Sequence, residues 1–472
     1  MLVFTALYSL ISLLNHYLVR TETLDLGVFN NAIWDYSHFK FNYGECLNKH
    51  RNNFLHDHFD LYLIMFSPLS HIFRSYTLLV VQIAAVVFGG LGVYRIAIKL
   101  HDDRWIASLA MIVFYSFFGV YGAIAFDYHS NVIAAMILPW FFYFLIQRKW
   151  KWVWVTLVLI LIGKENMALW MFFVCIGAFL FYFRQKEVRR PLVLMALFSV
   201  VYFVLVVQFV MPSLSPAGAY VHFKYSVLGD SMSDALINLI KRPFHYLQYL
   251  WENQRPDGKG AGLKEEFWLF FSMSGGILLL LRPAFIIMLV PVFLQKFYND
   301  RTSLWGINYQ YCIEFTPILA IGALYVVQMF SQRRIKRVVM GVLAIACCIT
   351  TFQALESSLG GPKNDKAQFY SKLHYVPKHD VAAIKKVLEM IPEEASVSGS
   401  SRLVAQLSFR DHAFRLPMTS EADYFVHCWD FSTYPLPRDG FARLVDDLKA
   451  SGEWKVVVDD GYMLLLKRIT AN

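Results

Sequence analysis

Long apolar runs separated by short basic clusters constrain this chain more than any other sequence feature. Several of these runs reach the length of ~17–25 residues that a helix needs to cross a lipid bilayer. Only 17% of the 472 residues are charged, whereas a soluble globular protein carries about 25%. A large soluble protein has no need of such runs, so the sequence predicts an all-α polytopic integral membrane protein.

The apolar pattern predicts about eleven spans. The first is expected to be retained, because the apolar N-terminus lacks a basic n-region and a small-residue cleavage site. The predicted spans lie near 1–17, 75–98, 105–124, 132–147, 151–163, 167–183, 191–212, 267–281, 284–297, 314–330 and 338–354.

The count depends on residues 148–190, which could form one long helix or a hairpin. Basic clusters flank this stretch at both ends, and only a hairpin leaves both clusters on one side of the membrane. Gly163 and Asn166 bracket Lys164 and Glu165 and favour a break there. We therefore expect a hairpin that turns at residues 163–166.

Basic residues in the loops give the orientation. With eleven spans, four basic turns fall on one side, which the positive-inside rule assigns to the cytoplasm. The net charge of +9 therefore reflects topology, and no nucleic-acid partner is expected. The residues are Arg95, Lys99, Arg104, Arg148, Lys149, Lys151, Arg184, Lys186, Arg189, Arg190, Arg333, Arg334, Lys336 and Arg337.

Three regions follow from this topology. Residues 1–354 are expected to form the transmembrane domain, with long outer loops at 18–74 and 213–266. In the second loop, apolar and aromatic segments at 235–240 and 244–251 should lie in the membrane interface or pack against the spans.

After a linker at 355–378, residues 379–472 are predicted to form a small α/β domain on the outer side. Helical spacing occurs at 379–390 and 441–448, between strand-like runs at 395–397, 424–426, 454–458 and 462–466. The domain shows no glycine-rich phosphate loop and no metal-ligand spacing, so a structural or docking role is expected. The six cysteines likewise form no C-x-x-C pattern.

Asp25 is the first carboxylate after the first span. It could act as a general base on an acceptor hydroxyl, or it could cap the N-terminus of a helix. Further along the same loop, His56-Asp57-His58-Phe59-Asp60 contains four ligand-type side chains. These side chains, Asp57 and His58 among them, could bind a divalent cation, or the imidazoles could face a phosphate, although a solvated loop would also show this pattern.

Other ionisable residues are expected near membrane depth on the same side, where such groups mark function by default. Lys164 and Glu165 could instead form an ion pair that pins the hairpin. Asp127 and His129 could be interfacial, and Tyr311 could belong to an aromatic belt. Because these residues come from separate regions and share one side, we predict an outward-facing polar pocket under the loops.

The order of several short motifs resembles an uncharacterised bacterial membrane-protein family of the GT-C glycosyltransferase clan. The motifs extend over nearly the whole chain: Asp25-Leu26-Gly27-x-Phe29 with Trp34, His58-Phe59 with Pro68, Leu78 to Gln82, Phe126 to His129, Lys164-Glu165, Tyr311 with Pro317, Ile391-Pro392 to Val397, and Leu407 to Arg410. Two positions depart from that family's pattern. Ser130 replaces a proline, and Asn166 replaces an acid, which makes Asp25 the better candidate base.

The resemblance implies a GT-C-like membrane enzyme of the bacterial inner membrane. Such an enzyme moves a sugar from a polyprenyl-phosphate donor to a glycan, lipid or protein acceptor on the extracytoplasmic face, with inversion. Asp25 would be the base. His58, Asp127, His129, Lys164, Glu165 and Tyr311 would bind the donor phosphate and sugar. A cation such as Mg²⁺ or Mn²⁺ could sit near Asp57 and His58.

Two other classes remain open from the sequence. A transporter or flippase for a lipid-linked or small polar substrate would also bring ionisable groups into the membrane. Such proteins often carry internal repeats and midplane binding groups, and neither is visible in this sequence. A non-catalytic assembly protein that binds partners through its C-terminal domain is the third possibility.

Overall fold

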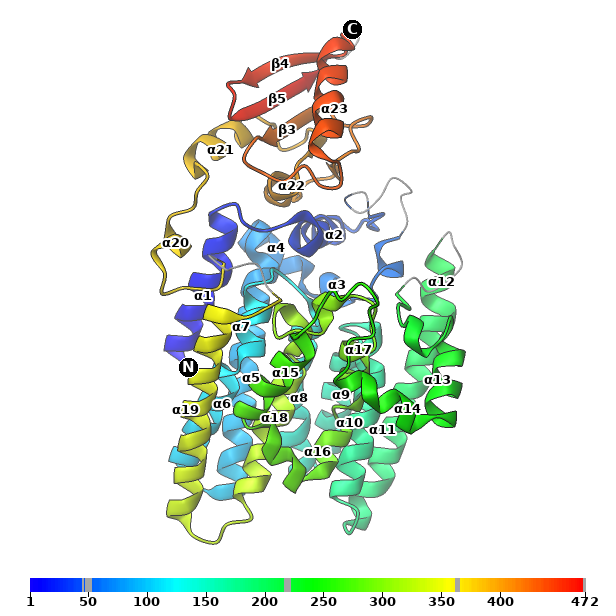
Figure 1. Cartoon of the computed structure of the whole chain (residues 1–472), viewed down its shortest axis with the longest axis vertical. Helices are drawn as coiled ribbons and strands as arrows, with labels where there is room; N and C mark the ends of the chain where they lie inside the picture. The colour runs from blue at the N-terminus through cyan, green and yellow to red at the C-terminus, as the bar shows by residue number, and fades with distance from the viewer. Residues whose placement is uncertain (45, 47–52, 216–221, 361–365, 470–472) are drawn as a thin grey trace.

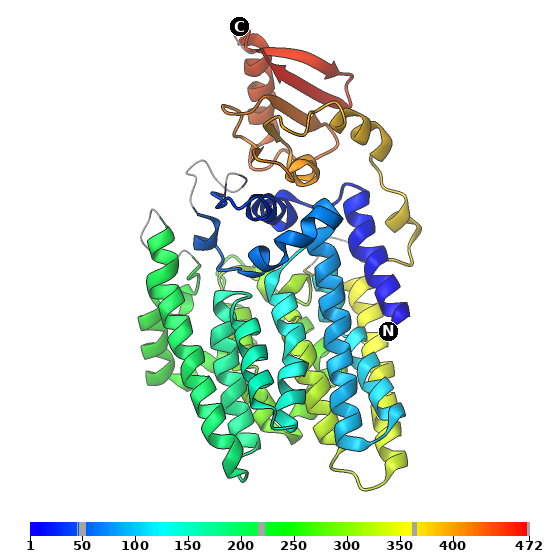
Figure 2. The same cartoon turned by 180° about the vertical axis from the view of Figure 1, so that it is seen from behind.

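The computed structural model describes residues 1–44, 46, 53–215, 222–360 and 366–469. Parts of the predicted loops 18–74 and 213–266, of the linker 355–378 and of the domain 379–472 lie outside the described residues. A bundle of upright helices forms the body of the molecule (Figures 1 and 2). Its main helices are α5 (Thr77–His101), α6 (Arg104–Ser116), α8 (Ser130–Ile146), α9 (Trp150–Leu161), α10 (Glu165–Phe181), α11 (Lys186–Leu205), α18 (Phe315–Val327) and α19 (Arg333–Ser357).

The membrane class is confirmed, but the count of eleven spans is not. Among the described residues, four helical stretches are long and apolar enough to cross a membrane: Tyr62–His101, Lys186–Leu214, Tyr309–Val327 and Arg333–Ser357. A fifth results if α6 and α7 (Phe118–Ile124), which bend by 48°, count as one span. The apolar helices α1 (Leu2–Tyr17), α8, α9 and α10 are shorter.

The predicted spans 267–281 and 284–297 are each broken into shorter pieces. The first divides into α15 (Leu263–Met273) and a 3-10 turn, because Gly275 adopts φ +94° between them. The second divides into α16 (Pro283–Ile287) and α17 (Val290–Phe297), each of which has a proline in its first turn. Proline lacks the N–H that would continue a preceding helix, so each proline begins a new segment.

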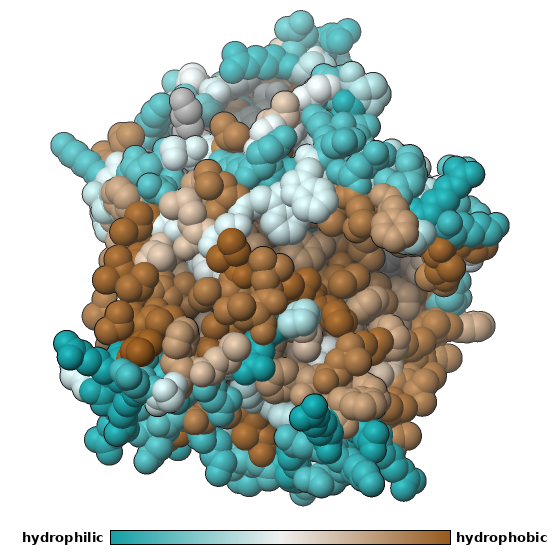
Figure 3. Space-filling view, turned by 60° about the horizontal axis from the view of Figure 1, so that its bottom comes forward, coloured by the Kyte–Doolittle hydropathy of each residue, from teal (hydrophilic) through white to brown (hydrophobic). Residues whose placement is uncertain are grey.

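The basic turns gather at one end of the bundle, and the C-terminal sheet lies at the other end (Figure 1). Asp103 joins two of these turns, because its Oδ2 accepts hydrogen bonds from Arg333 Nε at 2.6 Å and from Arg337 Nε at 2.8 Å. The face in Figure 3 carries a broad apolar belt with a hydrophilic rim at the basic end. This shared sidedness agrees with the predicted topology.

The predicted hairpin is confirmed, since α9 ends at Leu161 and α10 begins at Glu165. Gly163 sits in the turn, where an added Cβ would come within 2.6 Å of the Tyr62 ring. The loop that carries Tyr62 also pairs with the turn, through the Leu61 N–H and the Ile162 carbonyl oxygen at 3.0 Å. Only glycine leaves room for this close approach.

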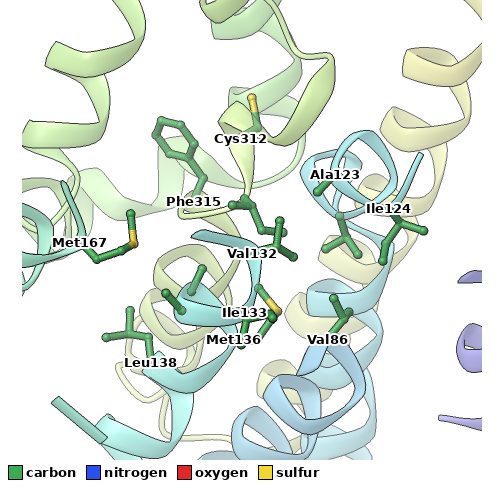
Figure 4. Packing of buried hydrophobic residues seen from close by; sticks show 14 of the residues in the cluster. Val86, Ala123, Ile124, Val132, Ile133, Met136, Leu138, Met167, Cys312 and Phe315 are labelled. Carbon is green, nitrogen blue, oxygen red and sulfur yellow. The ribbon is translucent and has the colours of Figure 1, made fainter. Parts of the chain in front are cut away.

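Below the outer loops, the bundle is packed with apolar side chains. Figure 4 shows residues from α5, α7, α8, α10 and the start of α18 meeting in one cluster. Val86, Val132, Met136 and Phe315 have no exposed surface there. This core fixes the upper ends of the helices, from which the loops with polar side chains emerge.

The loops at the sheet end contain short helices. They are the π-helical turn η1 (Thr23–Gly27), α2 (Val28–Ser37), η2 (Phe54–His56), α3 (Tyr62–Phe66), α4 (Ser70–Phe73) and α12 (Met211–Leu214). Helices α13 (Met232–Lys241) and α14 (Pro243–Leu247) lie farther from the sheet, about halfway down the bundle (Figure 1). The segments predicted at 235–240 and 244–251 fall partly in α13 and α14.

The C-terminal region has the α/β character that the sequence predicted. Its five strands follow the order β2-β1-β3-β5-β4, with β1 parallel to both neighbours and β5 antiparallel to both of its own. The division of the chain at residues 354 and 379 stays a prediction. The elements are α21 (Val381–Leu388), β1 (Val397–Gly399), α22 (Ser401–Leu407), β2 (Ala413–Arg415), β3 (Tyr424–Cys428), α23 (Arg438–Ala450), β4 (Trp454–Asp459) and β5 (Met463–Arg468). Helix α22 and strand β2 were not predicted.

Candidate functional site

Asp25 lies in the middle of η1, directly after α1. It caps neither η1, whose N-cap is Glu22, nor α2, whose N-cap is Gly27, so the helix-cap interpretation is wrong. The Asp25 side chain is 24% exposed, and its Oδ1 lies 4.0 Å from His129 Nε2. A carboxylate in this position is partly buried and still reachable from solvent.

The loop at residues 126–129 is fixed on both sides by one buried glutamine. Gln82 Nε2 donates a hydrogen bond to the Asp127 carbonyl oxygen at 2.7 Å, and its Oε1 accepts from the His129 N–H at 2.9 Å. Asp127 has φ +54°, and its Oδ2 accepts a hydrogen bond from the Glu22 N–H at 2.8 Å. Asp127 therefore ties this loop to η1 and places His129 beside Asp25.

Burial sets the charges in this group. Together with the nearby Asp127, it raises the pKa of Asp25 to about 7. Burial also raises the pKa of Asp127 to about 6. It lowers the pKa of His129 well below its usual value, with help from the positive charge of Lys164. His129 is therefore a neutral imidazole at pH 7, whereas Asp25 is a carboxylate that readily takes a proton.

A second group forms where the 57–60 segment meets the hairpin turn. His58 Nδ1 lies 3.3 Å from Glu165 Oε1, and the Phe59 N–H donates to Glu165 Oε2 at 3.3 Å. His58 also stacks on His222, with ring centroids 4.5 Å apart. His222 Nε2 in turn lies 3.2 Å from Asp57 Oδ1.

Asp57, His58 and His222 offer three ligand atoms within 4.8 Å of one another and could hold a metal ion. Asp57 and His58 were predicted as ligands, but His222 was not. A lone histidine in a long loop carries no spacing signal, and only the tertiary structure brings it to the other two.

Lys164 is partly buried at the hairpin turn. Among the described residues, Glu165 pairs with His58, and no ion pair joins it to Lys164. The ion pair proposed to pin the hairpin is therefore not formed, and the Lys164 ammonium is left without a carboxylate partner in the described part of the chain. A cation in this setting suits an anionic ligand such as a phosphate.

Tyr128 connects the two groups. Its hydroxyl donates a hydrogen bond to Asp60 Oδ2 at 3.0 Å, and Asp60 Oδ1 accepts from the Tyr62 N–H at 3.0 Å. The Phe29 ring contacts Tyr128 and His129, with centroids 5.1 and 6.5 Å away. The structure thus brings Asp25, Asp127 and His129 together, and Tyr128 links this group to the segment that carries His58.

A pocket adjoins the Asp25 side of the site. Phe126 forms part of its wall, stacks on His129 at 5.1 Å and contacts Tyr309 at 4.5 Å. Lys366, which sequence reasoning missed, supplies a cation to the lining. Tyr311, which was predicted, does not line this pocket; its ring lies 6.3 Å from that of Tyr309. Residues that line the pocket include Gly122, Phe126, Ile307, Tyr309, Leu355 and Lys366.

Comparisons with known proteins bear on the fold. A family profile described as "Predicted membrane protein (DUF2079)" matches residues 15–459. ArnT from Cupriavidus metallidurans bound to undecaprenyl phosphate has a TM-score of 0.58 and 10% identity, and the match covers 100% of this chain and 98% of that chain. The apo state of the same protein has a TM-score of 0.53 and 11% identity, covering 98% and 97%. A search of curated proteins returned no match. The predicted family and GT-C-like fold are confirmed.

Proposed function

This chain belongs to the DUF2079 family of predicted membrane proteins, and we propose that it is a membrane glycosyltransferase. It would move a sugar from a polyprenyl-phosphate donor to an acceptor hydroxyl on the extracytoplasmic face of the bacterial inner membrane. One observation carries the proposal. The partly buried Asp25 carboxylate lies 4.0 Å from His129 at the sheet end of the bundle, and the charge of Lys164, which forms no ion pair among the described residues, also acts on His129.

The proposed reaction begins at Asp25. Its carboxylate takes the proton of the acceptor hydroxyl, and the oxygen attacks the anomeric carbon of the sugar from the face opposite the phosphate. A carbon–oxygen bond forms to the acceptor while the carbon–oxygen bond to the phosphate breaks. The electron pair of that bond leaves with the polyprenyl phosphate. Because the attack comes from the opposite face, the configuration of the anomeric carbon inverts. A base is most effective when its pKa lies near the working pH, as it does for Asp25.

The leaving phosphate gains negative charge, and Lys164 is placed to stabilise it. Glu165 would hold His58 in position beside this phosphate, while Asp127 and the neutral His129 would donate or accept hydrogen bonds around the sugar. Tyr311, whose ring lies 6.3 Å from that of Tyr309, is proposed to help bind the donor. The undecaprenyl phosphate bound to ArnT, a protein with the same fold, supports a polyprenyl-phosphate partner for this chain.

The donor set near the hairpin also fits a divalent cation. Asp57, His58 and His222 would hold it, and it would offset phosphate charge when bound. Two imidazoles among three ligands favour a transition metal such as Mn²⁺ or Zn²⁺ over Mg²⁺, which prefers oxygen ligands.

The position of the polar residues favours a transferase over a transporter. They gather at the sheet end of the bundle, whereas transporters place their substrate groups near the midplane.

The proposal can be tested without knowing the acceptor. Membranes from the native host, with and without this protein, would be supplied with a polyprenyl-phosphate sugar carrying a radiolabel in the lipid. A transferase releases labelled polyprenyl phosphate and adds sugar to envelope glycans only when the protein is present. Movement of intact lipid-linked sugar across the membrane, with no release, would instead identify a flippase.

A further inference from the structure

Helix α22 of the C-terminal region packs directly on η1, the turn that carries Asp25. The Thr23 N–H donates a hydrogen bond to Ser401 Oγ at 2.9 Å, and Thr23 Oγ1 donates to the Ser401 carbonyl oxygen at 2.6 Å. At the other end of η1, a Cβ added to Gly27 would lie 3.2 Å from the Ala405 Cα. Helix α22 thus bounds η1 from its first residue to its last.

Arg402 extends this contact toward the carboxylates. Its Nε donates a hydrogen bond to Glu22 Oε1 at 2.9 Å. The backbone N–H of the same Glu22 donates to Asp127 Oδ2 at 2.8 Å. Contacts therefore run without interruption from α22, through Glu22, to the loop that holds His129 beside Asp25.

Several other contacts attach the C-terminal region to the bundle without touching η1. Arg74 forms an ion pair with Glu393 at 2.9 Å, and Lys40 forms one with Asp411 at 2.6 Å. Asn31 Nδ2 donates to the Arg410 carbonyl oxygen at 2.8 Å. Docking alone therefore does not require the contacts made by Ser401 and Arg402.

We propose that Ser401 and Arg402 are positioning residues of the transferase site, which hold η1 through Thr23 and Glu22 so that the Asp25 carboxylate faces the acceptor. This inference rests on the proposed function and gives the C-terminal domain a role in the reaction. Arg402 has a second effect, because its positive charge offsets the negative charge of the Glu22 carboxylate.

Because charges around Asp25 set its pKa, the positioning role predicts a change in the pH dependence of the activity. Glu22 and Asp127 both raise the pKa of Asp25, Lys366 lowers it, and Arg402 lowers the pKa of Asp127. Removing the Arg402 charge leaves Lys366 to offset the negative charges of Glu22 and Asp127. The pKa of Asp25 then rises further, and the acid limb of the activity profile moves to higher pH. Groups facing Asp25 are Glu22, Asp127, His129, Tyr309, Tyr311 and Lys366.

The test compares Arg402→Gln, Arg402→Lys and the control Arg74→Gln in the full-length protein. Arg74→Gln also breaks an ion pair between the C-terminal region and the bundle, but one remote from η1. We expect Arg402→Gln to lower kcat roughly tenfold, as a small misplacement of a reacting group does, with little change in the donor KM. Its acid limb should move up by about 0.5–1 pH unit, less than for a direct charge contact. Arg402→Lys should restore most of both, and Arg74→Gln should match the wild type.

Hydrogen exchange of residues 22–28 gives a second readout that does not depend on turnover. Exchange should rise in Arg402→Gln and stay unchanged in Arg74→Gln. Wild-type kcat, pH profile and exchange in Arg402→Gln, or equal losses in both variants, would overturn the positioning role. A lack of sugar transfer by the wild-type protein would instead overturn the proposed function, so the two failures can be told apart.

Discussion

Glu165 pairs with His58, with 3.3 Å between Oε1 and Nδ1, and not with the adjacent Lys164. This choice of partner has two consequences. The hairpin is held by contacts with the 57–60 segment, including the Phe59 N–H that donates to Glu165 Oε2. It also leaves the Lys164 ammonium able to meet an anionic ligand. The Glu165 contact thus links the fold of the turn to the chemistry proposed for the site.

Glu165→Gln should lower activity without lowering the amount of folded protein. The amide keeps an oxygen for the Phe59 N–H, but it loses the negative charge that orients His58. We expect turnover to fall roughly 10-fold to 100-fold, the usual effect of removing a partner that orients a site histidine. Sugar transfer would be measured against protein yield in the membrane. A parallel fall in yield would show that Glu165 only holds the hairpin.

Lys164→Gln should weaken donor binding. A hydrogen bond to a charged group is worth about 1.5–3 kcal/mol, so we expect affinity for undecaprenyl phosphate to fall roughly 10-fold to 100-fold. Binding to the purified protein would be titrated by intrinsic fluorescence. Lys149→Gln, which changes an exposed lysine at the basic end, is the matched control. Equal affinities for the wild type and Lys164→Gln would remove Lys164 from the phosphate site.

His222→Ala should reduce the metal content of the purified protein. Its imidazole is one of three ligand groups within 4.8 Å, and two remaining ligands hold a divalent ion weakly. Elemental analysis after dialysis against Mn²⁺ or Zn²⁺ would measure the loss. His245→Ala changes an exposed histidine of the same predicted loop and should keep the metal. If wild type and both variants bind equally little metal, the three side chains hold no ion.

The activity should depend on pH through Asp25. Because its folded pKa is raised to about 7, Asp25 is increasingly protonated as the pH falls below that value. A protonated carboxyl cannot take the acceptor's proton, so kcat/KM should decline below pH 7 and level off above about pH 8. A profile that stays flat between pH 5 and 8 would contradict a base with this pKa.

Some features of this fold can be predicted from residues that are close together in the sequence. Span-length apolar runs predict membrane helices, and the basic clusters predict which ends of α5, α8, α10 and α18 lie together. Gly163 and Asn166 mark the hairpin turn, and the alternation after residue 379 predicts a small α/β unit. Each of these signals depends on residues close together in the chain, which is why sequence reasoning could find them.

Other features depend on contacts between distant segments. His222 joins Asp57 and His58 only because a long outer loop folds back over them. Gln82 lies within the apolar helix α5, and nothing local shows that its amide binds the 126–129 loop. The broken segments between 263 and 297 have span-like composition, but glycine and proline geometry divides them.

Within the candidate site, Asp25, Asp127 and His129 were predicted to share one side of the membrane, and the structure brings them together. The pKa of Asp25 could not be predicted, because it depends on burial in the folded protein and on the proximity of Asp127. Lys366 was missed for a similar reason, since it reaches the pocket from beyond the last helix of the bundle.

Sugar transfer by Asp25→Asn tests the central claim most directly. The amide has nearly the size and shape of the carboxylate but cannot take a proton, so turnover should fall by roughly 10²–10⁴-fold. Binding of undecaprenyl phosphate should change little, because Asp25 acts on the acceptor. The variant should fold at least as well as the wild type, since it removes a partly buried charge that the folded state disfavours. Release of labelled polyprenyl phosphate at the wild-type rate by Asp25→Asn would contradict the assignment of Asp25 as the base.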